Sequence, residues 1–264
     1  MMELVFIEGV SGVGKSTMVR MLAEELRARG YTIRAYPEFD YTNPIDFYCT
    51  ACMPDGEYAS LFRQYPAEAD AIRANTIPAG NMRLVRYFDE DTPLFSEPLL
   101  QKMRQWEFCW HPPRPVPLAE YTAIYREVWR NFAASADSNF DFILFDGSLL
   151  HHPINDMMRN YGITGEQAVL HVQTLLDALG EIPRRIFYLQ TKNIGAQLCR
   201  AHHDRGQKLP TEGEIAFWEA RHRNDMTVLA AVRETLARFD VSDEGWDAAR
   251  ERILRLLYGE GECV

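Results

Sequence analysis

Five short segments rich in apolar, β-branched or aromatic residues recur along the chain. They cover residues 4–7, 31–36, 140–145, 185–189 and 237–241. Segments of this length and composition favour strands, and runs that are apolar throughout are typical of strands buried in a parallel sheet. Because helical patterns separate the five segments, the sequence predicts an α/β fold, in which a five-stranded parallel sheet carries helices on both faces.

Helical spacing of apolar residues is clearest directly after the first segment. There Met18, Val19, Leu22 and Leu26 would share one face of a helix that ends at Gly30. Further helices are expected over residues 164–179, where Thr164 and Gln167 fit a capping box, from residue 194, over residues 212–237, and after Ser242, whose acidic neighbours at 243 and 244 suit a helix start.

Residues 41–135 interrupt this alternation of strands and helices. They show no repeated strand pattern, and three stretches have helical spacing, at residues 58–75, 82–88 and 120–132. A proline-rich joint at residues 111–117 divides the region. Such a length exceeds what a loop in a compact domain normally has, so we expect a large helical insertion on the substrate side of one domain that spans residues 1–264.

The most specific motif lies between the first strand and the first helix. Gly9, Gly14, Lys15 and Ser16 fit the phosphate-loop pattern G-x-x-x-x-G-K-[ST]. Glycines allow consecutive N–H groups to surround a phosphate, and the following helix points its positive end at the same place. The alternative is a glycine-rich turn with a solvent-exposed lysine. The predicted nucleotide-binding residues are Gly12, Val13, Gly14, Lys15, Ser16 and Thr17.

Carboxylates follow two of the predicted strands. Glu38, Asp40 and Asp46 come after the second strand, and Asp146 ends the third. Open α/β sheets bind their ligands at the carboxyl ends of strands, although a polar loop would explain the first three equally well. A carboxylate at the tip of a buried strand needs a ligand or a hydrogen bond, so Asp146 is predicted to hold Mg²⁺ together with the Ser16 hydroxyl.

Composition narrows the class of protein. The 264 residues carry a formal net charge of −10, which disfavours a nucleic-acid polymer as partner. No apolar run approaches the roughly 20 residues of a membrane-spanning helix, and the chain enters its first strand directly, so we expect a soluble, cytoplasmic protein without a signal peptide. The C-x-x-C of Cys49 and Cys52 is interpreted as a chance pair. Adjacent histidines such as His151 and His152 point in different directions and seldom ligate one metal.

Taken together, these positions resemble the deoxynucleoside kinases and the related nucleoside monophosphate kinases. Residues 6–17 are similar to their phosphate loop, and Pro37-Glu38 to the glutamate that family uses as its proposed general base. Residues 185–206 look like their strand, helix and arginine lid, and residues 240–246 like the loop where adenine packs. The chain departs from the family at Gly147, where an arginine is usual, and at Gln207, which replaces the last arginine of the lid.

The resemblance implies a three-layer αβα P-loop NTPase fold with ATP and Mg²⁺ as cofactors. It implies an ATP-dependent kinase acting on a nucleoside or nucleotide, with Lys15 on the phosphates, Glu38 as base, and Arg200 and Arg205 in a lid over residues 200–212. Asp40 is the alternative base. Arg83 and Arg86, one helical turn apart, are candidate contacts to an anionic acceptor, although a solvated helix face explains them at least as well.

Three other functions stay open at this point. The chain could be a nucleotide-dependent switch or ATPase that acts on a protein partner, or a scaffold with a decayed site. It could also be a kinase for a non-nucleoside alcohol such as a sugar or an antibiotic. A homodimer is equally compatible with the sequence.

Overall fold

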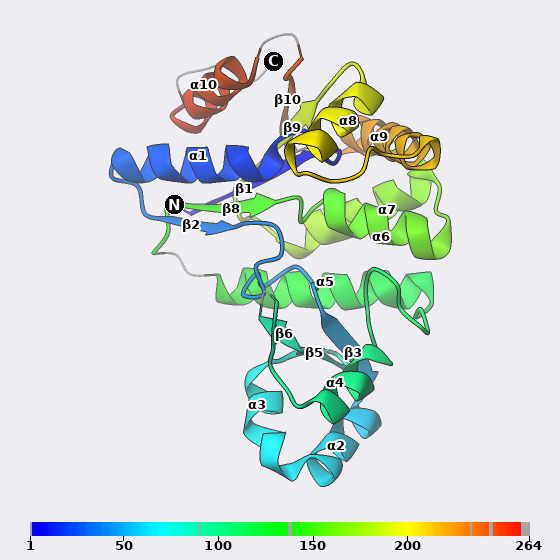
Figure 1. The fold of residues 1–264 in the computed structure, drawn as a ribbon. Coiled ribbons are helices and arrows are strands. Elements are labelled where there is room, and N and C mark those ends of the chain that lie inside the picture. The colour runs from blue at the N-terminus through cyan, green and yellow to red at the C-terminus, as the bar shows by residue number, and fades with distance from the viewer. Residues whose placement is uncertain (1, 90, 137–138, 233, 243–244, 260–264) are drawn as a thin grey trace.

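A five-stranded parallel sheet forms the centre of the molecule. The computed structural model describes residues 2–89, 91–136, 139–232, 234–242 and 245–259 (Figure 1). The strand order is β10-β9-β1-β8-β2, and every neighbouring pair is parallel. The strands are β1 (Glu3–Gly9), β2 (Ile33–Tyr36), β8 (Phe142–Asp146), β9 (Arg184–Gln190) and β10 (Thr235–Asp240). The five-stranded parallel sheet predicted from the sequence is therefore confirmed.

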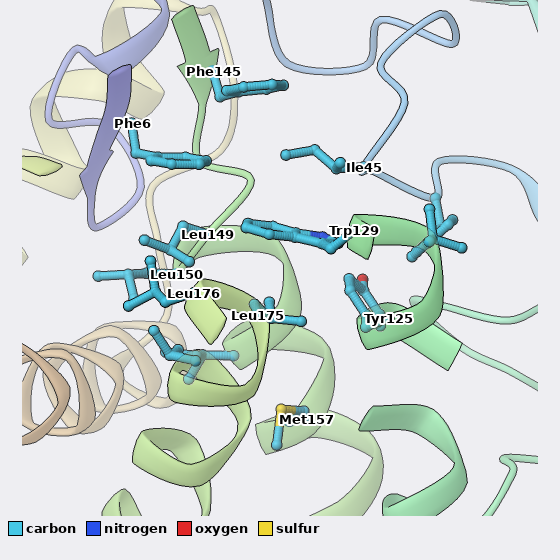
Figure 2. Close-up of a cluster of buried hydrophobic side chains, with 14 of the residues drawn as sticks. Phe6, Ile45, Tyr125, Trp129, Phe145, Leu149, Leu150, Met157, Leu175 and Leu176 are labelled. Atoms are coloured by element: carbon cyan, nitrogen blue, oxygen red, sulfur yellow. The ribbon is translucent and has the colours of Figure 1, made fainter. Parts of the chain in front are cut away.

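Helices cover both faces of this sheet, because alternate strand residues point to opposite sides. Val5 and Ile7 of β1 pack into one apolar cluster with α1 (Lys15–Ala28), α8 (Ile194–Asp204) and α10 (Trp246–Leu257). Leu4 and Phe6 pack into a second cluster on the other face (Figure 2). That second cluster contains α5 (Leu118–Ser135), α6 (His151–Tyr161), α7 (Gly165–Ala178) and α9 (Glu212–Ala231). The result is a three-layer α/β arrangement.

Helix boundaries agree with the sequence signals at one cap and differ at two other places. Thr164 caps α7, and its capping box with Gln167 is present. Helix α9 ends at Ala231 rather than at 237, because the chain from Thr235 onward pairs with β9. Residues 243 and 244, the predicted acidic start of the last helix, lie outside the described residues, and α10 begins at Trp246 with Gly245 as its N-cap.

The insertion is a mixed unit rather than a helical one. It contains an antiparallel sheet in the order β3 (Thr50–Pro54), β5 (Met82–Arg86) and β4 (Thr76–Ala79). It also contains a short pair of strands and several short helices, which lie below α5 in Figure 1. These are β6 (Phe88–Asp89), β7 (Thr92–Pro93), α2 (Asp55–Gln64), the 3-10 helix η1 (Pro66–Glu68), α3 (Ala69–Ala74) and α4 (Glu97–Arg104).

Two helix predictions in this region are wrong, each for a physical reason. The segment at 82–88 is strand because its neighbours Leu84 and Val85 are both fully buried, in different apolar clusters on the two sides of the small sheet. The single helix predicted over 58–75 is broken at Tyr65, because Pro66 cannot donate a helical hydrogen bond. The helix predicted over 120–132 lies within α5. No helix among the described residues is long and apolar enough to cross a bilayer.

Candidate functional site

The loop that joins β1 to α1, here called the glycine loop (residues 9–17), packs against two helices, α8 and α10. Gly12 and Gly14 have φ angles of 76° and 95°, and a Cβ at either position would lie 2.6 Å from Ala201 of α8 or from the Trp246 ring of α10. Gln197 donates to the Gly12 carbonyl at 2.7 Å, and Trp246 Nε1 donates to the Val13 carbonyl at 3.3 Å.

These contacts orient the peptide groups of the glycine loop. The C=O and N–H of a trans peptide point in opposite directions. Since the carbonyls of Gly12 and Val13 face α8 and α10, the next two N–H groups point away from those helices. This arrangement, at the start of a 14-residue helix, suits an anionic ligand.

Lys15 lies at the bottom of a cleft beside the glycine loop. Its side chain is 5% exposed, and Nζ lies 3.3 Å from the Val10 carbonyl and 3.2 Å from His151 Nδ1. Burial lowers the pKa of Lys15, while the negative charges of Asp146, Glu38 and Glu8 oppose that shift. The buried Lys15 ammonium, with these acidic groups around it, suits a polyanionic ligand that carries a cation with it.

Gly147, directly after β8, lies where α6 packs against Lys15. Its φ is 70°, and a Cβ there would lie 2.8 Å from His151 Cβ and 3.4 Å from Lys15 Cε. A side chain of any size at this position would displace one of those two groups. Glycine therefore lets α6 approach the glycine loop closely enough for His151 to contact both Lys15 and the Gly9 carbonyl, the latter at 3.0 Å.

A fully buried carboxylate ties the glycine loop to α6. Glu8, the residue before Gly9, accepts hydrogen bonds from the backbone N–H groups of Leu149 and His151 at 2.8 and 2.9 Å. These N–H groups lie at the start of α6, where a negative side chain is favourable. Burial nevertheless raises the pKa of Glu8 to about 7, against the opposing effect of those hydrogen bonds and of Lys15.

Asp146 is a buried carboxylate whose negative charge acts on Lys15. The residue is 1% exposed, and its Oδ2 accepts the backbone N–H of Glu38 at 3.3 Å. Its Oδ1 is buried and has no hydrogen-bond partner among the described residues. Burial raises the pKa of Asp146, an effect that the Lys15 charge and the nearby Ser16 hydroxyl oppose. A free carboxylate oxygen beside an exposed serine hydroxyl is a donor set of the kind Mg²⁺ binds in protein sites.

Glu38 faces the cleft from the opposite wall, and His152 stands behind it. His152 Nε2 lies 3.8 Å from Glu38 Oε1, and Nδ1 contacts Asp46 Oδ2. Burial favours a higher pKa for Glu38, but the hydrogen bond from His152 and the charges of Lys15 and Arg205 outweigh it, so the pKa lies below its ordinary value. The Glu38 carboxylate is therefore held in its ionised form.

Two hollows meet at Glu38 and His152. The cleft beside the glycine loop is lined by that loop together with Glu38, Phe39, His151, Arg205 and Gln207. A second, much tighter pocket shares Phe39 with this cleft and is lined by Asp46 and His152, by polar residues of α6, and by an aromatic group. The aromatic group comprises Phe39, Phe47, Tyr48, Trp110 and Tyr125.

Two of these aromatic residues have unusual backbone conformations. Phe39 and Trp110 have φ angles of 67° and 68°, which large side chains rarely adopt, and their side chains are 44% and 43% exposed. Such strain concentrates at functional sites. Phe39 also lies 4.9 Å from the ring of Tyr48, so it forms part of the rim of the pocket.

The structure brings some of the predicted site residues together and separates others. Arg205 lines the cleft, whereas Arg200 is exposed and is not among its lining residues. Asp40 accepts the backbone and side-chain donors of Thr42 at 2.8 and 2.6 Å, so its carboxylate closes a turn beside the cleft.

The prediction that Arg83 and Arg86 share one face of a helix is wrong. Both lie in strand β5, where residues three positions apart point to opposite faces. Arg83 pairs with Asp55 at 3.0 Å, away from the cleft. Arg86 donates to the Asn43 carbonyl and faces Asp46 and Asp40, although burial lowers its pKa. Arg86 therefore braces the loop that carries these acidic residues.

The described residues contain one cluster with metal-binding spacing, formed by Glu38, His151 and His152. Lys15 Nζ lies 3.2 Å from His151, and Asp46 already contacts His152, so the electrostatics of this cluster disfavour a metal ion. Cys49 and Cys52 belong to no such cluster and are free thiols, and burial raises their pKa values to about 11 and about 12.

Comparison with known proteins adds little to these contacts. No family model and no curated protein match the chain. Among solved structures, it is similar to the YorR protein from Bacillus subtilis, crystallised in complex with phosphorylated GDP. The identity is 13% over 97% of this chain and 96% of that chain, with a TM-score of 0.45. The chemistry of the site therefore rests on the contacts of this chain itself.

Three site residues escaped the sequence patterns, namely Glu8, His151 and His152. The sequence predicts that the side chains of His151 and His152 point in different directions, but one ring nitrogen of each lies within 4.8 Å of the other and of a Glu38 carboxylate oxygen. Glu8 carries no signal of its own in the sequence except that an acidic residue ends an otherwise apolar strand. That is the same signal by which Asp146 was selected.

Proposed function

We propose that the protein is an ATP-dependent kinase for a small molecule, and that it transfers the γ-phosphate to a hydroxyl or phosphate acceptor, with a nucleoside or nucleotide as the favoured class. The observation that carries the proposal is the placement of Lys15. It is buried beside a glycine loop with outward-turned carbonyls, it lines one cleft together with Glu38, and the negative charge of Asp146 acts on it. Phosphoryl transfer requires mainly positioning and positive charge around the moving group.

Each residue then has a definite task on the donor side. The N–H groups of the glycine loop and the Lys15 ammonium would bind the phosphates of ATP. Ser16 and the unpartnered oxygen of Asp146 would hold Mg²⁺, which would neutralise charge on the phosphates. Arg205 is the lid cation that lines the cleft, and it would close over the γ-phosphate.

On the acceptor side, the aromatic pocket lies next to the base. Glu38 would accept the proton of the attacking hydroxyl. Phe39 and Trp110 would stack on a planar ring and exclude water, which otherwise hydrolyses the donor. A switch that acts on a protein would not need an aromatic pocket beside its catalytic carboxylate, so this pocket favours the kinase.

The test is an assay of ATP consumption over a panel of nucleosides, nucleotides and sugars. Wild type should consume ATP only with an acceptor present. Lys15→Met should lower the rate by about 10²- to 10³-fold, as for the loss of one transition-state cation. Lys102→Ala is the matched control, because Lys102 pairs with Glu57 on the insertion. Slow hydrolysis indifferent to every acceptor would favour the switch, and the absence of ATP binding in calorimetry would favour the scaffold.

A further inference from the structure

We propose that His152 is a positioning residue for the proposed reaction: an imidazolium held between Asp46 and Glu38 that fixes the Glu38 carboxylate where the cleft meets the aromatic pocket. The proposal rests on the proposed function for its kinetic part. Its structural part, the charged bridge itself, stands on the contacts of the ring.

Each ring nitrogen of His152 faces a carboxylate. Nδ1 contacts Asp46 and Nε2 faces Glu38 at 3.8 Å, and the side chains of His152, Asp46 and Glu38 are 13%, 15% and 27% exposed. A neutral imidazole has one N–H and can donate to one carboxylate, whereas an imidazolium donates from both nitrogens. The charges of two carboxylates on either side of a nearly buried ring are therefore balanced by the cation and not by the neutral ring.

The charged groups around the ring favour this state. Burial lowers the pKa of His152, but Asp46 and Glu38 together raise it to about 10. Asp146 from β8 adds a third negative charge, while the positive start of α6 opposes the cation; burial and the charge of Lys15 from α1 lower the pKa of the adjacent His151, which therefore stays neutral. The remaining titratable groups that line the same walls are Asp156 and Arg159 of α6, Cys109, Tyr48 and Tyr125 in the pocket, and Arg205 in the cleft.

The bridge would restrain Glu38 from two sides. Its backbone N–H is bonded to Asp146, and its side chain is drawn towards His152. Because His152 lines the pocket and Glu38 lines the cleft, the carboxylate is directed at the junction where an acceptor oxygen would meet the γ-phosphate. Loss of the bridge should therefore impair the chemical step more than the binding of ATP.

Two variants and one control test this role. His152→Asn removes the cation, and Asp46→Asn retains the ring but removes one of its two carboxylates. His171→Asn is the control, since His171 is equally a buried histidine but bonds to Thr122 and has no carboxylate partner in the described part of the chain. We expect kcat to fall by about 10- to 10²-fold in His152→Asn, a part of what a general base contributes, with the KM for ATP unchanged. The kcat of Asp46→Asn should fall less than that of His152→Asn, and the control should keep the wild-type kcat.

A spectroscopic measurement separates the bridge from the proposed function. In nitrogen-15 NMR of the full chain at pH 7.5, both ring nitrogens of His152 should be protonated in wild type. The population of that state at the same pH should fall in Asp46→Asn. A neutral His152 ring in wild type overturns the proposal, and so does a wild-type kcat in both variants. If no acceptor supports transfer, the proposed kinase fails, while the ring measurement still decides whether the bridge exists.

Discussion

Replacing Gly147 by alanine tests the closest packing in the candidate site. The added Cβ would lie 2.8 Å from His151 Cβ and 3.4 Å from Lys15 Cε, and the residue keeps a φ of 70°. Both the backbone and the neighbours therefore oppose the substitution. Gly162 provides the matched control, because it ends the same helix α6 with a φ of 59° but has nothing within 4 Å of a built Cβ.

The two substitutions share one cost and differ in the other. A left-handed backbone costs an alanine about 1–2 kcal/mol of folding free energy at either position. Overpacking a well-packed site adds about 1–3 kcal/mol, and only Gly147→Ala incurs it. We therefore expect Gly162→Ala to lose about 1–2 kcal/mol and Gly147→Ala about 2–5 kcal/mol.

Urea unfolding of the purified proteins measures these losses, provided that the slope of each transition stays the same. Calorimetric titration with ATP and Mg²⁺ should then show weaker binding in Gly147→Ala, because His151 and Lys15 must shift, and wild-type binding in Gly162→Ala. Equal losses of stability in the two variants would show that Lys15 and His151 do not meet at Gly147 as described.

Two further predictions concern Glu8 and Trp110. A raised carboxyl pKa means that the folded state holds an extra proton, so the stability contributed by Glu8 is present below pH 4.5 and is lost as the pH rises through about 7, by roughly 3 kcal/mol. In urea unfolding at pH 4.5 and 7.5, wild type should therefore lose more stability than Glu8→Gln by about this amount, and equal losses in the two proteins would contradict the prediction. Trp110→Ala should raise the KM for the acceptor about 10-fold and leave the KM for ATP and the melting temperature unchanged, as expected for a half-exposed stacking ring. Steady-state kinetics with both substrates varied measures the two KM values. A rise in the KM for ATP would place Trp110 on the donor side.

The donor side could be foreseen from the sequence because each of its signals is local or follows from strand parallelism. Strand β2 pairs directly with β8, with Tyr36 beside Phe145, so the residues after the two strand ends had to become neighbours. That is how Glu38 and Asp146 come to share a hydrogen bond. The glycine loop and the cap of α7 likewise depend on residues within one turn of each other.

The insertion could not be foreseen, since its strands lack a distinguishing period. In β5, Leu84 and Val85 are consecutive and both buried, so neither a two-residue nor a helical repeat describes them. Because residues 82–88 were expected to be helical, Arg83 and Arg86 were expected on one face; in a strand they lie on opposite faces. The role of Glu8 also depends on where α6 begins in space, and no spacing within the sequence encodes that distance.

The cap that Glu8 places on α6 has a consequence for the size of the acceptor. The Glu8 carboxylate accepts two hydrogen bonds from the start of α6 and so fixes this helix to β1. Helix α6 therefore has a fixed position beside the cleft and the aromatic pocket. It carries His152 at the junction with the cleft and Arg159 on the wall of the pocket, and at 1.5 Å per residue these lie about 10 Å apart along the helix axis. A molecule that reaches from His152 to Arg159 is about as long as two linked rings. The spacing of these two residues on α6 would therefore select acceptors of the proposed reaction by their length.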